Sequence, residues 1–212
     1  MVCRDYHKSD NHPSVFDALH NLANCQQAHL ATHGAYNCED PNSSYLTLAE
    51  NKGIKFPLWM TAAIRTQADV ILLSACESNL NGQATEGLLT PVGIGPTLAA
   101  AGAKTVVGTL WPCDGLAALC FSFYFYTISQ ANPKLPWHQV ATQAREKLRN
   151  TTYDKLDAIV EEVGIDGECY KAMKELKAEQ IMYDAATETE ALGLFEPLQM
   201  WAGFTVLGKS LK

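Results

Sequence analysis

The sequence predicts an α/β fold with a mainly parallel sheet and helices on both faces. Apolar runs of strand length alternate with segments whose apolar residues recur at helical spacing, and this alternation is typical of parallel strands joined by crossover helices. Two of the apolar runs stop at residues that can carry out chemistry, His33 and Cys76. The carboxyl ends of parallel strands meet at one rim of a sheet, where ligands gather. We therefore expect a functional site at that rim.

Each element follows from a local signal. A helix over residues 14–24 has apolar positions at helical spacing, with Ser14 as its expected N-cap. A helix over 95–101 has Pro96 near its start and Gly102 after its end, which is the favoured arrangement. The expected helices are 14–24, 59–67, 95–101, 116–129 and 137–149, and the expected strands are 26–32, 70 to just before Cys76, 104–110 and 204–207. Loops are expected at 37–57, with a small hairpin around 45–49, and at 79–90.

Residues 151–190 interrupt this alternation. They are acidic, poor in apolar residues and helix-prone, with alternating charges over 171–180. We interpret them as a helical insert, either a solvated arm or an element that binds a partner.

Composition limits the possible functions. The 212 residues, 47% of them apolar, suffice for one domain with a sizeable core. The formal net charge of −7, without any basic block, argues against a nucleic-acid or membrane surface. The seven cysteines form no CxxC pair, and the start of the chain lacks the apolar core of a secretory signal, so a reduced, cytoplasmic setting is expected. The histidines show no metal-ligand spacing, and His29 is assigned a surface or packing role. Neither a metal nor another cofactor is expected.

His33 and Cys76 have the chemistry of a catalytic dyad. Cysteine has a substantial thiolate fraction near neutral pH, and a neighbouring imidazole raises that fraction. His33 would accept the thiol proton and later donate it to the leaving amine. The backbone amide of Cys76 could stabilise the oxyanion, and Gly34 leaves room for a second amide. The alternative is that Cys76 is a buried core cysteine and His33 a hydrogen-bonded loop histidine.

Four motifs, in order, resemble the CHAT domain, a family of caspase-like peptidases related to caspases, separase and gingipains. They are Ala31-Thr32-His33-Gly34, Leu73-Ser74-Ala75-Cys76-Glu77-Ser78, the run from Ala100 to Pro112, and Trp201-Ala202-Gly203-Phe204 with Leu207-Gly208. The resemblance implies that His33 and Cys76 are the catalytic dyad and that the amides of Gly34 and Cys76 form the oxyanion hole. It also implies an antiparallel last strand at 204–207.

The chain departs from the family pattern in two places. Members usually have Trp-Pro-Val-Asp-Asp after the third strand, whereas this chain has Trp111-Pro112-Cys113-Asp114-Gly115. A complete CHAT domain also has about a hundred more residues, with two strands, before the His33 strand. Only one helix is expected there, which would expose the edge of the 26–32 strand. We therefore expect residues 1–212 to be the C-terminal catalytic part of a CHAT domain within a longer polypeptide, or to pair with a second chain.

The sequence thus predicts a cysteine endopeptidase that cleaves a protein substrate through a thioester, and the resemblance implies that the enzyme is regulated. CHAT domains often follow tetratricopeptide or sensor modules in bacterial defence systems, including RNA-guided CRISPR assemblies. The resemblance therefore implies an upstream regulatory module or an effector complex as partner. Asp114 and Glu77 are the candidate substrate-binding residues, and Asp114 has the alternative role of capping the helix that begins near Leu116. The alternative function is a catalytically silent scaffold that binds a partner protein.

Overall fold

The computed structural model describes most of the chain, and the account below concerns those residues. They are 2–3, 14–37, 40, 43–49, 54–61, 63–75, 78, 93–165, 167–168, 170–171, 174–175, 194–195 and 198–208. The chain divides into two units, and each is described by itself. The first comprises residues 1–113, 134–141 and 203–212, and the second comprises 114–133 and 142–202.

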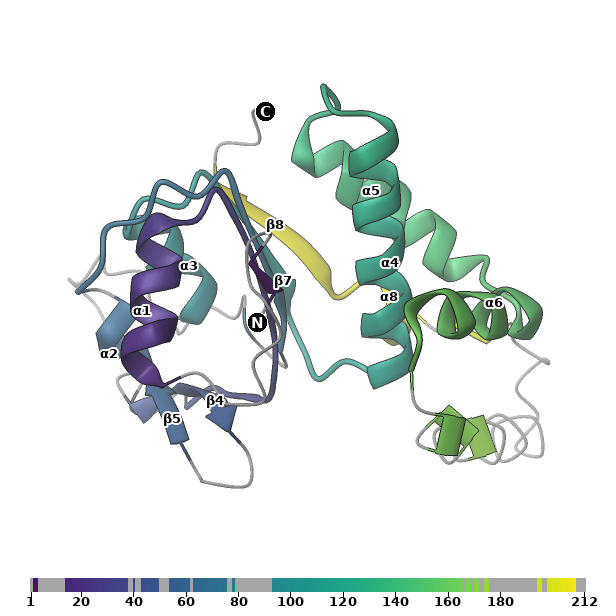
Figure 1. Cartoon of the computed structure of the whole chain (residues 1–212), viewed down its shortest axis with the longest axis horizontal. Coiled ribbons are helices and arrows are strands. Elements are labelled where there is room, and N and C mark those ends of the chain that lie inside the picture. Colours follow the sequence, from purple (N-terminus) through teal and green to yellow (C-terminus); the bar gives the residue numbers. More distant parts are fainter. Residues whose placement is uncertain are drawn as a thin grey trace. The chain divides into compact units, whose positions relative to one another are not determined.

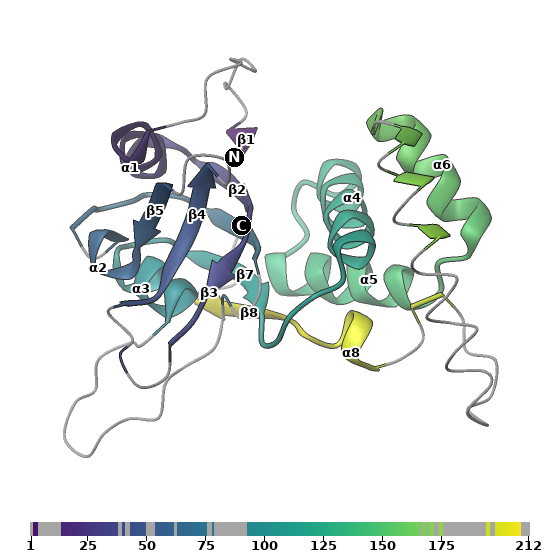
Figure 2. The same cartoon turned by 90° about the horizontal axis from the view of Figure 1, so that it is seen from below.

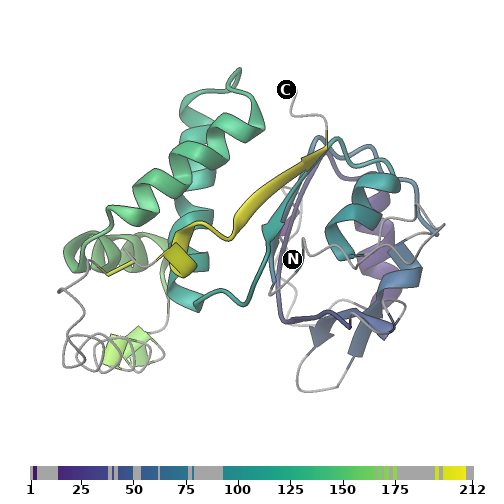
Figure 3. The same ribbon diagram turned by 180° about the vertical axis from the view of Figure 1, so that it is seen from behind.

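A five-stranded sheet forms the centre of the first unit (Figure 1). Its strands, in spatial order, are β1 (Val2–Cys3), β2 (Gln27–Ala31), β6 (Val70–Ser74), β7 (Thr105–Thr109) and β8 (Phe204–Gly208). The three central strands are parallel, and β8 runs antiparallel to β7, beside which it lies in Figure 3. The expected mainly parallel sheet with an antiparallel last strand is therefore confirmed.

The edge of β2, which the sequence analysis expected to be exposed, is paired with another strand. Val2 pairs with His29 and Cys3 with Ala28, so β1 adds an antiparallel strand to that edge. The expectation that a single helix precedes β2 was therefore incomplete. A two-residue strand carries too weak a local signal to be recognised from sequence, because its pairing depends on a partner far along the chain.

Two helices cover one face of the sheet. Helix α1 (Val15–Asn24) has the predicted Ser14 N-cap, and the Ser14 hydroxyl accepts a hydrogen bond from the Asp17 amide at 3.1 Å while the Asp17 carboxylate accepts from the Ser14 amide at 2.9 Å. This reciprocal pair is a capping box. Helix α3 (Ile94–Ala100) lies on the same face as α1 (Figure 1).

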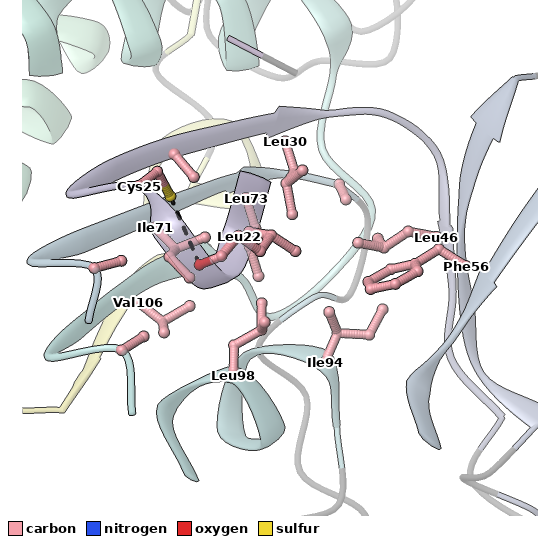
Figure 4. Close-up of a cluster of buried hydrophobic side chains, with 14 of the residues drawn as sticks. Leu22, Cys25, Leu30, Leu46, Phe56, Ile71, Leu73, Ile94, Leu98 and Val106 are labelled. Atoms are coloured by element: carbon pink, nitrogen blue, oxygen red, sulfur yellow. Dashed lines mark hydrogen bonds between the residues drawn. The ribbon is translucent and has the colours of Figure 1, made fainter. Parts of the chain in front are cut away.

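The core of the first unit lies between these helices and the sheet. Figure 4 shows side chains of α1, α3 and the alternate residues of the strands that meet there. They include Leu22, Leu30, Ile71, Leu73, Ile94, Leu98 and Val106, all 2% exposed or less. The two central strands β6 and β7 are buried on the opposite face of the sheet as well, since Leu72 and Val107 are 1% and 0% exposed. Strands buried on both faces explain the continuous apolar runs in the sequence.

A small antiparallel sheet follows directly after His33. Its strands, in spatial order, are β3 (Gly34–Ala35), β4 (Tyr45–Ala49) and β5 (Ile54–Pro57), and Figure 2 shows β4 between the other two. The hairpin predicted around 45–49 is confirmed, and β3 is an addition to it. Leu46 and Phe56 attach this sheet to the core, where both are 1% exposed.

The helix predicted over 59–67 is much shorter in the structure. Helix α2 comprises only Leu58–Thr61. At Thr66 the backbone makes hydrogen bonds outside any helix. The Thr66 amide donates to the Ala101 carbonyl at 3.0 Å, and the Thr66 hydroxyl accepts from the Ala68 amide at 3.2 Å. This segment passes so close to Gly102 that a Cβ there would lie 2.4 Å from the Thr66 carbonyl oxygen. Tertiary contacts at the end of α3 therefore override the helical pattern.

The second unit is helical. Its helices are α4 (Gly115–Ala131), the later part of α5 (Trp137–Arg149), α6 (Tyr153–Val163) and α8 (Leu198–Trp201). The helices predicted at 116–129 and 137–149 are confirmed, and α6 begins the predicted helical insert. The carboxylate of Asp157 on α6 accepts hydrogen bonds from Lys174 at 2.7 and 2.9 Å and from Tyr170, which ties α6 to the residues that follow it. No helix among the described residues is long and apolar enough to cross a membrane.

Candidate active site

The parallel register places the ends of β2 and β6 side by side. The last registered pair joins Ala31 to Ser74, and the Thr32 amide donates to the Ser74 carbonyl at 3.1 Å. In the sequence, His33 lies two residues beyond Ala31, and Cys76 lies two residues beyond Ser74. Neighbouring strands are about 4.8 Å apart. The two strands therefore lead towards one place at the rim of the sheet.

His33 is an exposed residue on a fixed backbone. Its carbonyl accepts a hydrogen bond from the Thr47 amide at 2.8 Å, and Gly34 opens β3 by pairing with Leu46. The hydroxyl of Thr32 donates to the Thr47 carbonyl. These bonds hold the turn between β2 and β3, while the His33 side chain stays accessible to a substrate.

Cys76 and Glu77 lie outside the described residues, but the residues on both sides of them are described. Ala75 is 4% exposed and Ser78 is 0% exposed. The Thr109 hydroxyl donates to the Ala75 carbonyl at 2.7 Å, and the Thr109 amide donates to the Ser78 hydroxyl at 3.1 Å. The Ser78 carbonyl accepts from the Gly95 amide at 2.7 Å. The chain is thus anchored immediately before Cys76 and immediately after Glu77.

Asp114 caps a helix, which was one of its two predicted roles. Its side chain accepts a hydrogen bond from the Ala117 amide at 3.0 Å, as the N-cap of α4. The residue belongs to the second unit, whereas His33 and Gly34 belong to the first. The substrate-binding roles of Asp114 and Glu77 therefore stay predictions.

One pair near the rim was missed by the sequence analysis. His29 of β2 lies with its Nε2 atom 2.8 Å from the Ser74 hydroxyl, which links β2 to β6 by side chains. Burial lowers the pKa of His29 to about 4, so the imidazole is neutral at physiological pH. A surface or packing role for His29 was expected, whereas the structure shows a side-chain bond between positions 45 residues apart. The local sequence offers one signal for this bond: Ala28 and Leu30, on either side of His29, face the core, so the His29 side chain lies on the opposite face of the strand.

The described residues also bear on metal binding. Among them, no three His, Cys, Asp or Glu side chains gather as they would around a metal ion.

Comparison with known protein families places this architecture in a defined class. Residues 11–209 match the CHAT domain. The match covers nearly the whole chain, and CHAT domains are caspase-like peptidases. The chain therefore belongs to the CHAT domain family, as its four motifs indicated. No curated protein matches it.

Proposed function

We propose that this chain is a cysteine endopeptidase in which Cys76 is the nucleophile and His33 its base. The observation that carries the proposal is the register of β2 and β6, whose last pair, Ala31 and Ser74, precedes His33 and Cys76 by the same two residues. Membership of a caspase-like peptidase family supports it. The exposed side chain of His33 suits a group that must exchange protons with substrate and water.

The reaction proceeds in two stages. His33 takes the proton of the Cys76 thiol, and the thiolate attacks the carbonyl carbon of the scissile peptide bond. The amides of Gly34 and Cys76 bind the oxyanion of the tetrahedral intermediate. When the C–N bond breaks, the imidazolium of His33 gives its proton to the leaving amine, and a thioester remains. His33 then takes a proton from water, the hydroxide attacks the thioester, and the carboxylic acid and the Cys76 thiol are released.

The test of the dyad is a comparison of single and double variants. Cys76→Ala and His33→Ala should each abolish cleavage of a proteome-derived peptide library and keep the fold, and the double variant should lose little more than either, because the two residues act as a unit. Cys113→Ala, which removes a half-buried cysteine, is the matched control and should retain activity. Substantial cleavage by Cys76→Ala would exclude the peptidase mechanism.

Alkylation separates the peptidase from a silent scaffold. Iodoacetamide should label Cys76 faster than the other six cysteines, and His33→Ala should slow that labelling, because the imidazole stabilises the thiolate. A Cys76 that reacts no faster than the other cysteines would favour the scaffold.

We further propose that the peptidase is regulated. A tetratricopeptide or sensor module upstream, or an effector complex, would bring His33 and Cys76 into alignment in response to a signal in bacterial defence or signalling. The isolated 212-residue chain should then turn over substrate more slowly than the intact assembly. Equal turnover by the two preparations would contradict this.

Asp114 is proposed to select a basic residue before the cut, in addition to capping α4. Asp114→Asn removes the charge and keeps a good N-cap, because asparagine caps helices about as well as aspartate. The variant should therefore lose any preference for Arg or Lys in a peptide-library profile without losing stability. An unchanged preference would leave Asp114 as a cap only.

A further inference from the structure

The second unit contains a cleft of about 700 Å³ among α4, α5 and α6 (Figure 1). All of the residues that line it belong to the second unit. The helix α5 contributes positions 143, 146, 147 and 150, and α6 contributes positions 155, 158, 159 and 162. Each set has the spacing i, i+3, i+4 and i+7, so each helix turns one face to the cleft over two turns, about 10 Å.

The floor of the cleft is apolar. Its most buried lining residues are Tyr124 of α4 and Ile159 of α6, which are 9% and 4% exposed, and Phe123 is half-buried beside them. The Tyr124 hydroxyl lies 3.0 Å from the Thr151 hydroxyl, in the short connection between α5 and α6. This bond fixes α4 to the corner where the two walls meet. A concave surface with an aromatic floor is typical of a binding site.

The rim of the cleft carries exposed charges of both signs, Glu146, Lys147, Lys155 and Glu162. Within the described part of the chain, none of the four forms an ion pair with another side chain. The other side of α6 differs, because Asp157 there is paired with Lys174 at 2.7 Å. The helix α6 thus uses its charge away from the cleft within the chain, and its charges on the cleft side stay available to a partner.

The charges are unevenly distributed along the cleft. Lys147 lies two residues before the end of α5, and Lys155 lies two residues after the start of α6, so both are near the corner. Glu162 lies one residue before the far end of α6. The carboxylates disfavour a nucleic acid or another polyanion. A helix has the complementary distribution, because its macrodipole favours acidic residues in the first turn and basic residues in the last.

We propose that this cleft binds an amphipathic helix of a protein partner. The acidic first turn of that helix lies beside Lys147 and Lys155, and its basic last turn lies beside Glu146 and Glu162. Bulky apolar side chains at i, i+4 and i+7 pack on the floor, as in other complexes of a helix with a groove. The docked helix completes a four-helix arrangement with α4, α5 and α6. Of the two roles expected for the insert over 151–190, the proposal assigns partner binding to its first helix, α6.

The test begins with a selection from a phage-displayed library of alanine-based helices of about 18 residues, which is long enough for isolated helicity. The 212-residue chain is the bait, and peptides that also bind its Ala158→Trp variant are removed. Ala158 is exposed on the cleft wall, so tryptophan fills the cleft without entering the core. The matched control Glu161→Trp, at an exposed position of α6 outside the cleft, should bind the selected peptides as the wild type does.

Selected peptides should share the apolar stripe, an acidic first turn and a basic last turn. Failure to obtain any peptide that needs the open cleft would overturn the proposal. Cleft-dependent peptides that lack this pattern would overturn it as well, because the ligand would then be of another class.

The affinity of one selected peptide, labelled with a fluorophore, then tests the rim. The double variant Lys147→Glu, Lys155→Glu should bind it about tenfold more weakly, because two attractions become two repulsions. Lys134→Glu with Lys171→Glu makes the same change of net charge at exposed positions outside the cleft, and should stay within about twofold of wild type. Equal weakening in both double variants would contradict a specific contact at the rim.

Two controls separate this proposal from its neighbours. It does not depend on the proposed peptidase function, so Cys76→Ala should bind the peptide as tightly as the wild type does, whether or not the chain is a peptidase. Sedimentation of the chain alone tests for self-association. A concentration-dependent dimer that Ala158→Trp abolishes would show that a second copy occupies the cleft, and would overturn the assignment to a partner helix.

Discussion

The half-buried imidazole of His29 makes the first unit sensitive to acid. Burial lowers the native pKa of His29 to about 4, whereas in the unfolded chain the imidazole has its ordinary pKa of 6.5. Between these two values the unfolded chain binds more protons than the native one, so unfolding becomes more favourable as the pH falls. We expect His29 to cost no stability above pH 6.5, and its cost to grow from pH 6.5 down to pH 4. A His29→Gln variant cannot titrate and should escape this loss.

The size of the effect follows from the two pKa values. One pKa unit corresponds to about 1.4 kcal/mol, so the interval from 6.5 to about 4 is worth about 3 kcal/mol once the pH lies below both pKa values. At pH 5 the unfolded histidine is almost fully protonated and the native one is mostly neutral, and the unfolding free energy should have fallen by about 2 kcal/mol relative to pH 7. Domains are stable by about 5–15 kcal/mol, so this loss is readily measured.

The assay is guanidinium denaturation at pH 7 and pH 5, followed by far-ultraviolet circular dichroism. Wild type, His29→Gln and the control His20→Gln, which replaces an exposed histidine of α1, are compared. Carboxylates titrate alike in all three proteins, so their contribution cancels in the differences. Wild type and His20→Gln should lose about 2 kcal/mol more than His29→Gln between the two pH values. An equal loss in all three proteins would refute a His29 that stays neutral in the native state at pH 5.

Two further predictions concern contacts in the two units. A Cβ at Gly203 would lie 2.8 Å from the indole of Trp111, so Gly203→Ala should destabilise the first unit by about 1–3 kcal/mol, and a Trp111→Ala background should remove most of that cost in a double-variant cycle. Additive losses would contradict the clash. In the second unit, Asp157→Ala should lower overall stability by no more than about 1 kcal/mol, because the Asp157–Lys174 pair is solvent-exposed. The same variant should speed hydrogen exchange at Tyr170 and Lys174, and unchanged exchange there would show that Asp157 does not hold this segment.

Local chemistry in the sequence was sufficient for most of the elements. The capping box of α1 needs only Ser14 and Asp17, three residues apart, and the structure shows both of its hydrogen bonds. Strands β6 and β7 were visible as apolar runs because both of their faces are buried. The order of four motifs indicated the CHAT family, and residues 11–209 match it.

The site was only partly predictable. His33 and Cys76 each follow a strand, and the sequence placed both at one rim because parallel strands end together. The register of β2 and β6, in which Ala31 lies opposite Ser74, is a property of the strand pairing and could not be taken from the sequence.

Tertiary structure alone decided the contacts that support this rim. The His29–Ser74 bond joins residues 45 positions apart, and the Thr109–Ala75 bond joins residues 34 positions apart. The helix predicted over 59–67 ended early for a similar reason, since the backbone at Thr66 bonds to Ala101. Helix caps and strand alternation arise between residues a few positions apart, and a sequence displays these neighbours directly. A hydroxyl that donates to a carbonyl on another strand has a partner far away in the sequence, and the packing of the whole sheet determines which carbonyl that is.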